Sequence, residues 1–277
     1  MKRGQFKIQK VSNIGTSNTI MSALTIGMFD LIDFAEITKE EKDIIKKTNL
    51  NIAKHLTKAE KIAIKICSAI ENKYKSIEKN GIETQSNDRC VTIPNIECLD
   101  DVRDFLKYGK QALQEMVQIF NIFLNTAGSL PKYNILLQEI KKQMGENDPI
   151  YITLKNDHDS WLKYFLDLRS AEEHPTTMVP KGKEFYYDFD INWSEEDQKW
   201  IVYFPHFYEG TSIYELLKVS VHNIFTFIEE MNILFLQKRM PSIVEIRKVP
   251  NDRVKDYADR RYVVALKDDF PVKKTNS

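Results

Sequence analysis

Apolar residues recur at helical spacing along most of the chain. Between residues 19 and 36 they return every three to four positions, which predicts a buried helix. A lysine-rich helix is predicted next, to about residue 79, because Thr38 and Glu41 have capping-box spacing and Gly81 suits a helix end. The same spacing predicts helices in four further segments: 99–124, 131–144, 158–173 and 212–238.

The ends of two of these helices have candidate caps. Asn156 or Asp157 is expected to cap the helix at 158–173. Ser212 and Glu215 have capping-box spacing at the start of the helix at 212–238. That last helix is apolar around most of its circumference, which is typical of a central position in a bundle or of a subunit interface.

The only clear β pattern lies between these two helices. Residues 185–191 and 200–204 flank a polar link, SEEDQ, and predict a hairpin. Residues 243–248 and 262–266 are candidates for two terminal strands. Residues 82–96 are polar and unpatterned, and are therefore predicted to be a loop.

The predicted fold class is mainly α: a helical bundle with a small β hairpin and a short C-terminal β extension. We expect one helical domain over residues 1–277. The pattern also allows a subdivision into three parts: an N-terminal helical extension (1–80), a bundle (97–240) with a hairpin insertion (184–205), and a C-terminal tail (241–277).

Composition narrows the functional classes. The 40 basic and 40 acidic residues cancel, which counts against a nonspecific nucleic-acid or membrane-surface binder but allows a local basic pocket. Three cysteines without a CxxC pair predict neither a disulfide framework nor a zinc site. The first apolar run contains Asp30 and Asp33 and is too short to span a bilayer, so we expect a cytoplasmic protein.

The segment Arg169–His174 has the residues for phosphate chemistry. With Trp161 at 0° on an ideal helix, Arg169 lies at about 80°, at the edge of the apolar stripe. A guanidinium there needs a carboxylate, a phosphate or a partner subunit. Pro175 disfavours helical geometry at His174, so this histidine can bend back. Arginine can hold a phosphate while histidine transfers protons near neutral pH.

An arginine followed by four residues and a histidine, at the end of an amphipathic helix, resembles the signature of the HEPN superfamily. The resemblance covers the motif and its helix closely, and residues 99–124 and 212–238 by pattern alone. It implies a HEPN-like helical bundle, usually a homodimer in which the motif helices of two protomers form one cleft. It also implies a metal-independent endoribonuclease, often in toxin–antitoxin or other defence systems.

The resemblance also implies residue roles. Arg169 would bind the scissile phosphate, and His174 would move protons while the RNA 2′-hydroxyl attacks, leaving a 2′,3′-cyclic end. No metal or cofactor is required, because the substrate supplies the nucleophile. Ser170 lies within the motif and Lys181 and Lys183 lie in the loop just after His174, and all three are candidate substrate contacts. The expected partners are a second copy of the chain, RNA, and an antitoxin or regulatory protein; no membrane partner is expected.

Two alternatives remain open. Ser170 stands where active members commonly carry Asn, Asp or His, and catalytically silent members exist, so the chain can instead be a non-catalytic dimerisation or binding module. The motif can also be accidental, with Arg169 paired to Asp167, Glu172 or Glu173 and His174 as a cap. A metal site at His158 and Asp159 is less favoured, since no further ligands follow at ordered positions.

Overall fold

The protein is mainly α-helical. The computed structural model describes residues 17–81, 85–87, 90–92, 98–126, 132–173, 187–188, 191–196, 199–202, 206–207, 211–250, 252–254 and 260–268. Its helical elements are α1 (Thr19–Ser22), the π-helical turn η1 (Ala23–Gly27), α2 (Met28–Phe34), α3 (Lys39–Asn80), α4 (Leu99–Leu124), α5 (Tyr133–Met144), α6 (Pro149–Asp157), the π-helical turn η2 (His158–Leu162), α7 (Lys163–Glu173) and α8 (Ile213–Gln237).

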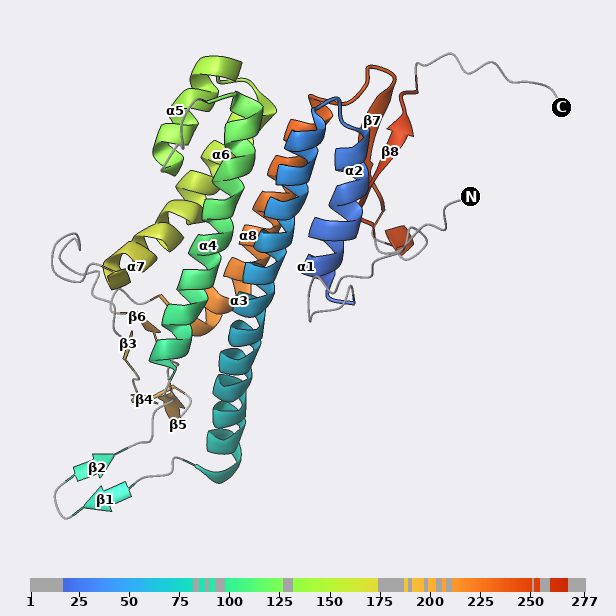
Figure 1. Ribbon diagram of the computed structural model, residues 1–277. Coiled ribbons are helices and arrows are strands. Elements are labelled where there is room, and N and C mark those ends of the chain that lie inside the picture. Colours follow the sequence, from blue (N-terminus) through green and yellow to red (C-terminus); the bar gives the residue numbers. More distant parts are fainter. Residues whose placement is uncertain are drawn as a thin grey trace, which may run out of the picture.

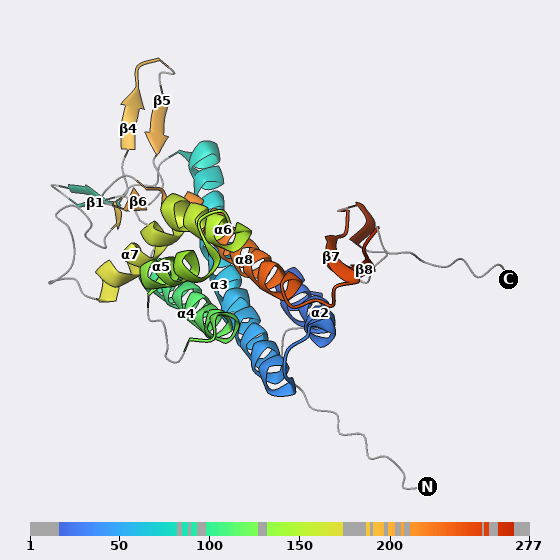
Figure 2. The same cartoon turned by 90° about the horizontal axis from the view of Figure 1, so that it is seen from above.

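The long helix α3 forms the centre of the bundle (Figure 1). It packs along α4 and α8, and α1, η1 and α2 contact it from another side. Helices α4 to α7 lie on one side of α3, whereas α2 and the last two strands lie on the other, as the view from above shows (Figure 2). Buried residues of α3 therefore share one hydrophobic core with those of α4 and α8.

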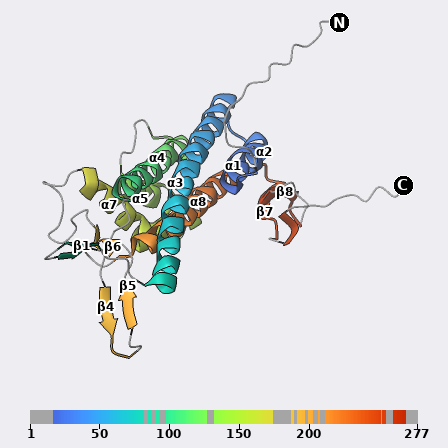
Figure 3. The ribbon, with the colours of Figure 1, turned by 90° about the horizontal axis from the view of Figure 1, so that it is seen from below.

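Eight short strands accompany the helices, and they pair only as antiparallel couples among the described residues. The strands are β1 (Gln85–Asn87), β2 (Cys90–Thr92), β3 (Tyr187–Asp188), β4 (Ile191–Ser194), β5 (Lys199–Val202), β6 (His206–Phe207), β7 (Val244–Lys248) and β8 (Tyr262–Leu266). The β4–β5 hairpin projects from the bundle (Figure 3), with Trp193 opposite Trp200. The predicted terminal strands are confirmed as the β7–β8 pair.

Local chemistry explains the ends of α3. The Thr38 amide donates to Glu41 Oε2 over 2.7 Å, and the Glu41 amide donates to Thr38 Oγ1 over 3.2 Å, which confirms the predicted capping box. Gly81 ends the helix at φ 76°, a backbone conformation that favours glycine. At α8, the Ser212 hydroxyl accepts from the Glu215 amide over 3.3 Å, but the described contacts include no return bond, so only half of that predicted box forms.

The helix that carries Arg169 begins earlier than predicted. Asp148 caps it by accepting from the Ile150 amide over 2.9 Å, and Pro149 occupies its first turn. The predicted cap at Asn156 or Asp157 is therefore wrong, because α6, η2 and α7 run on as one helical path. The Asp157 carboxylate instead accepts from Trp161 Nε1 over 2.7 Å.

Two other predictions need correction. The segment 82–96, predicted to be a loop, contains the β1–β2 pair. The predicted hairpin exists, but its paired strands are β4 and β5, so the first strand lies nearer the turn than residues 185–191. Strand β3, which precedes the hairpin in sequence, pairs antiparallel with β6, which follows the hairpin.

Helix α8 is central, as its apolar circumference predicts. It packs against α3, α4 and α6, and its buried face carries a polar pair. Asn232 and Asn49 of α3 each donate an amide hydrogen to the other's side-chain oxygen over 3.2 Å, and both residues are fully buried. Because this pairing is satisfied only in one register, it fixes α8 against α3. Within the described part of the chain, no helix is long and apolar enough to cross a lipid bilayer.

Candidate functional site

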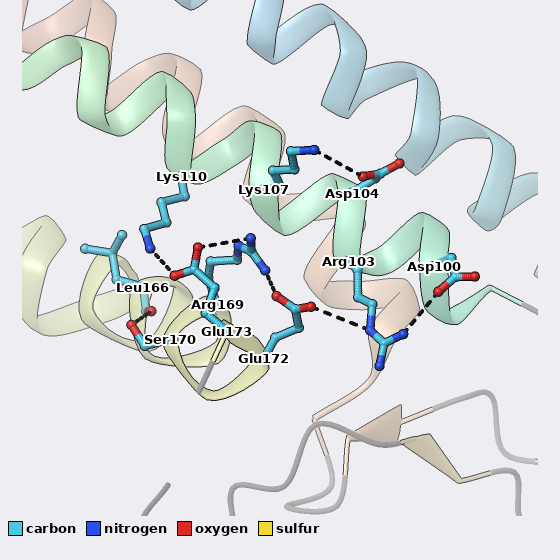
Figure 4. Close-up of polar contacts among 10 residues, drawn as sticks. All are labelled: Asp100, Arg103, Asp104, Lys107, Lys110, Leu166, Arg169, Ser170, Glu172 and Glu173. Carbon is cyan, nitrogen blue, oxygen red and sulfur yellow. Dashed lines mark hydrogen bonds and ion pairs between the residues drawn. The ribbon is translucent and has the colours of Figure 1, made fainter. Parts of the chain in front are cut away.

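Arg169 lies near the end of α7, at the border of the buried stripe formed by Phe165, Leu168 and Ala171. Its side chain is only 13% exposed and is directed toward α4 (Figure 4). Close packing brings the two helices together: a Cβ atom on Gly109 of α4 would overlap the Phe165 ring. The absence of a side chain at Gly109 therefore lets α7 approach α4 and brings Arg169 to the interface.

Two carboxylates of its own helix neutralise Arg169. Its guanidinium pairs with Glu172, three residues on, and its Nη2 lies 3.0 Å from Glu173 Oε1. Spacings of three and four residues put all three side chains on one face of α7. The sequence offered Asp167, Glu172 and Glu173 as partners of Arg169, and the structure pairs Arg169 with Glu172 and Glu173.

Helix α4 supplies further cations to the same carboxylates. Lys110 pairs with Glu173, and Arg103 Nε lies 3.7 Å from Glu172 Oε1. Arg103 also donates from Nη1 to Asp100 over 3.1 Å. We refer to these six residues as the α4–α7 charge network: Asp100, Arg103, Lys110, Arg169, Glu172 and Glu173. Its three cations and three carboxylates balance.

One donor of the network remains without an acceptor. The Nε atom of Arg169 is buried, and no residue that the structure describes accepts a hydrogen bond from it. A buried guanidinium N–H without an acceptor is costly, because it has lost water and gained nothing in exchange. Arg169 therefore carries one guanidinium N–H whose hydrogen-bonding capacity the described residues leave unused.

Beside the network lies a cavity of about 550 Å³, which we call the α4–α7 cavity. Helices α4, α5 and α7, the turn η2 and Lys132 before α5 line it. Its ionisable and hydroxyl-bearing lining residues are Lys110, Lys132, Tyr133, His158, Lys163, Asp167 and Ser170. Three lysines and one carboxylate thus line the cavity, and Lys110, which is paired with Glu173, belongs to both the cavity and the charge network.

The residues predicted from the sequence have different outcomes. The structure places Arg169 in the charge network and Ser170 in the cavity wall, where its hydroxyl also donates to the Leu166 carbonyl over 2.9 Å. His174, Lys181 and Lys183 lie outside the described residues. Their roles remain predictions.

Sequence reasoning missed Arg103 and Lys110. They are seven residues apart on α4, which places them on one helix face two turns apart. That spacing was the available signal that two cations share a surface. It could not identify the partner surface, because Glu172 and Glu173 lie more than 60 residues away in sequence.

The His158–Asp159 pair forms an ordinary polar contact. His158 Nδ1 lies 3.0 Å from Asp159 Oδ1, and Lys155 reaches the other oxygen at 3.3 Å. The hydrogen bond with His158, and then the one with Lys155, lowers the pKa of the Asp159 carboxyl. Among the described residues, no three His, Cys, Asp or Glu side chains lie close enough together to hold a metal ion.

The chain matches no protein-family model, no curated protein and no solved structure. The geometry above is thus the basis for a functional assignment, together with the sequence motif.

Proposed function

We propose that this chain is a HEPN-like endoribonuclease that cleaves RNA without a metal ion. The observation that supports this proposal is the buried Nε–H of Arg169, which lacks an acceptor among the described residues at the end of the motif helix. A phosphate oxygen is a suitable acceptor, because a guanidinium binds phosphate with several parallel hydrogen bonds.

Phosphate binding has to compete with Glu172 and Glu173 for Arg169. The network lowers the cost of this exchange. If a phosphate takes the guanidinium, Glu173 keeps its pair with Lys110, and Glu172 remains near Arg103. Neither carboxylate is then left as an isolated, partly buried charge, which is the main penalty for breaking an ion pair.

The proposed reaction needs only groups of the RNA and of the protein. The RNA 2′-oxygen forms a bond to phosphorus as the bond to the 5′-oxygen breaks, giving a 2′,3′-cyclic phosphate and a 5′-hydroxyl end. His174 is proposed to take the 2′-hydroxyl proton, or to return a proton to the leaving 5′-oxygen. Arg169 would stabilise the charge that develops on the phosphate oxygens.

The proposal includes assembly. We propose a homodimer that brings two motif helices into one cleft, and an antitoxin or other regulatory partner that controls it. The balanced network favours such control, because a neutralised Arg169 is a weak attractor for RNA until a partner or substrate displaces its carboxylates. Light scattering after gel filtration measures the first point directly; a monomer at micromolar concentration would contradict it.

A specific observation also favours the second candidate, a non-catalytic dimerisation or binding module. Arg169 has two carboxylates within its own helix, and its charge is balanced without any substrate. In that case the network joins α7 to α4 and has no chemical role. The two candidates predict different effects when one carboxylate is removed.

Replacing Glu173 with Gln separates them. The substitution changes the charge of the network from balanced to one excess positive charge and weakens the hold on Arg169. An endoribonuclease should then cleave RNA faster at low substrate concentration, with a lower KM, in buffer containing EDTA. A binding module should show no cleavage and a modest loss of stability, since these side chains are partly exposed.

The controls define the outcome. His174→Ala should abolish cleavage while the protein remains folded, and the products of the unsubstituted protein should carry 2′,3′-cyclic ends. Glu78→Gln, an exposed change at the far end of α3, should leave KM unchanged. Absence of cleavage by both the unsubstituted protein and Glu173→Gln, with dimers intact, would favour the non-catalytic module.

A further inference from the structure

Strand β8 has one edge that no other strand covers within the described residues. Its other edge pairs with β7, and in that ladder the Lys267 amide donates to the Ile243 carbonyl over 3.1 Å. Because backbone groups along an antiparallel strand point alternately to its two sides, odd-numbered residues of β8 face β7 and even-numbered ones face outward. The outward residues are Tyr262, Val264 and Leu266. Their amides have no acceptor among the described residues.

The outer edge of β7, by contrast, is covered by the end of α8. The outward amide of Ile246 donates to Gln237 Oε1 over 2.6 Å, and the Val244 amide donates to the Pro241 carbonyl over 3.0 Å. An isolated two-stranded hairpin is marginally stable in water, and an open strand edge pairs readily with another strand. The open edge of β8 is therefore the side of this sheet at which a third strand can add.

A groove of about 450 Å³ follows this open edge between β8 and α2. Successive side chains of a strand point to opposite faces, so a groove that touches all five residues of β8 follows the edge of the strand. On the side of α2 the lining residues are Asp30, Leu31, Asp33 and Phe34. Phe34 and Leu266 are both exposed in the groove. An occupant should therefore present apolar side chains near Phe34 and a cation near the aspartates.

Strand β8 runs in the same direction as α2. Arg260, just before β8, lies 2.6 Å from Asp30. The end of β8 pairs with the start of β7, which follows the end of α8, and there the Glu36 amide donates to the Arg239 carbonyl over 2.6 Å. The start of β8 thus lies near Asp30, and its end lies near the C-terminal end of α2. Although Asp30 and Asp33 each pair with one cation, both side chains remain at least half exposed.

The sequence before α1 contains a segment that meets these requirements. Residues 6–10 precede the first described residue and read Phe-Lys-Ile-Gln-Lys, so in a strand Phe6, Ile8 and Lys10 would share one face. We propose that this segment of the same chain adds to β8 as a third, antiparallel strand, with Ile8 opposite Val264. The proposal concerns the far side of α3 from the charge network and does not depend on RNA cleavage.

This register satisfies both the backbone and the side chains. Phe6 is opposite Leu266 and Lys10 is opposite Tyr262, so each outward residue of β8 exchanges two backbone hydrogen bonds with its partner. Phe6 then lies at the end of the groove that exposes Phe34. Lys10 lies at the other end, where the carboxylate of Asp30 is half exposed.

The length of the connecting chain fits this arrangement and sets its direction. Asp30 lies about 17 Å along the helical path from Thr19, at 1.5 Å per residue. Residues 10–17 can span up to about 23 Å when extended. A chain that leaves the start of α1 therefore reaches the beginning of β8 at Lys10, and residues 10 to 6 continue toward its end. The added strand is antiparallel to β8 for this reason.

Hydrogen exchange of the full chain, read by mass spectrometry on peptides that contain β8, tests the proposal. Ile8→Pro removes the N–H that bonds to the Val264 carbonyl, whereas Gln9→Pro removes one that points away from β8. We expect the outward amides of β8 to exchange about tenfold faster in Ile8→Pro than in the parent, and Gln9→Pro to resemble the parent. Circular dichroism checks that both variants fold.

Two lysines provide a matched test of the charge. Lys10 faces Asp30 in the proposed strand, and Lys7 points to the opposite face. Lys10→Gln should therefore speed exchange of the outward amides of β8 at low salt, and less so at high salt, whereas Lys7→Gln should not. An equal effect of the two substitutions would overturn the proposed register.

The same measurement distinguishes other occupants of the groove. Equal exchange of β8 in the parent and in Ile8→Pro would overturn the proposal and leave the edge open for a partner protein. Protection that falls when the protein is diluted would assign the added strand to a second copy, which also overturns pairing within one chain. Protection that is independent of concentration and lost in Ile8→Pro, but kept in Gln9→Pro, is the result that the proposal requires.

Discussion

Replacing Glu229 with Gln should remove a loss of stability that the protein suffers as pH rises from 4.5 to about 7. The Glu229 side chain is 2% exposed on α8, and its Oε2 lies 2.9 Å from Arg261 Nη1, just before β8. Burial raises the pKa of Glu229 to about 7, while Arg261 and Lys248 oppose the rise and Glu230 adds to it. The folded protein therefore binds a proton that the unfolded chain releases near pH 4.5.

The direction of the effect follows from this difference. Below pH 4.5 the carboxyl is protonated in both states and contributes no penalty. As pH rises toward 7, the unfolded chain loses its proton first, so the free energy of unfolding falls. Above about 7 both states are ionised and the loss is complete. The interval from 4.5 to about 7, at 1.36 kcal/mol per pH unit, corresponds to about 3 kcal/mol.

Urea unfolding at a series of pH values measures this contribution. The free energy of unfolding of Glu229→Gln, minus that of the parent, should rise by most of about 3 kcal/mol from pH 5 to pH 8. Glutamine keeps the shape but does not titrate, so other groups cancel in the difference. Glu195→Gln, an exposed change in the β4–β5 turn, should give a constant difference. A constant difference for Glu229→Gln as well would refute the argument.

Three further substitutions test the packing by urea unfolding. Asn49→Leu should cost about 1–3 kcal/mol, because it leaves the Asn232 amide partly unsatisfied, whereas changing both residues to Leu should cost less than the two single changes added together. Gly109→Ala should cost about 1–3 kcal/mol, since its new methyl overlaps the Phe165 ring; an unchanged stability would contradict the close approach of α4 and α7. Thr38→Ala should cost about 1 kcal/mol through loss of the cap on α3, and no loss would mean that this cap is unimportant.

The bundle was largely predictable, because helical periodicity and capping chemistry are local. Helix α4 has the predicted bounds, and Thr38 and Gly81 delimit α3. The start of the Arg169 helix was not predictable in the same way. Asp148 and Pro149 are equally suited to a turn and to a helix N-terminus, and only the packing of α6 against α8 distinguishes them. The π-helical turn η2 has no comparable local signal.

The candidate site was predictable only in part. The position of Arg169 at the edge of the apolar stripe requires a partner for its charge, and nearby Glu172 and Glu173 were apparent candidates. The contributions of Arg103 and Lys110 depend on how α4 packs against α7. Pairing between residues so far apart in sequence cannot be deduced from one sequence.

The charge network and the cavity make different use of their cations, although they share Lys110. In the network three carboxylates balance three cations, whereas the cavity is lined by Asp167 and by three lysines, of which Lys110 is already paired with Glu173. Lys110 belongs to both the cavity and the charge network. It lines the cavity, and it would still pair with Glu173 if Arg169 bound a phosphate.

This sharing predicts that Lys110→Gln lowers the rate of RNA cleavage. Glu173 would lose its pair with Lys110 and remain on Arg169, so a phosphate would displace it less readily. Lys132→Gln should leave cleavage of saturating RNA unchanged, because Lys132 lines the cavity and does not belong to the charge network. If Lys110→Gln leaves cleavage intact, Glu173 does not compete with phosphate for Arg169, and the proposed exchange of partners is wrong.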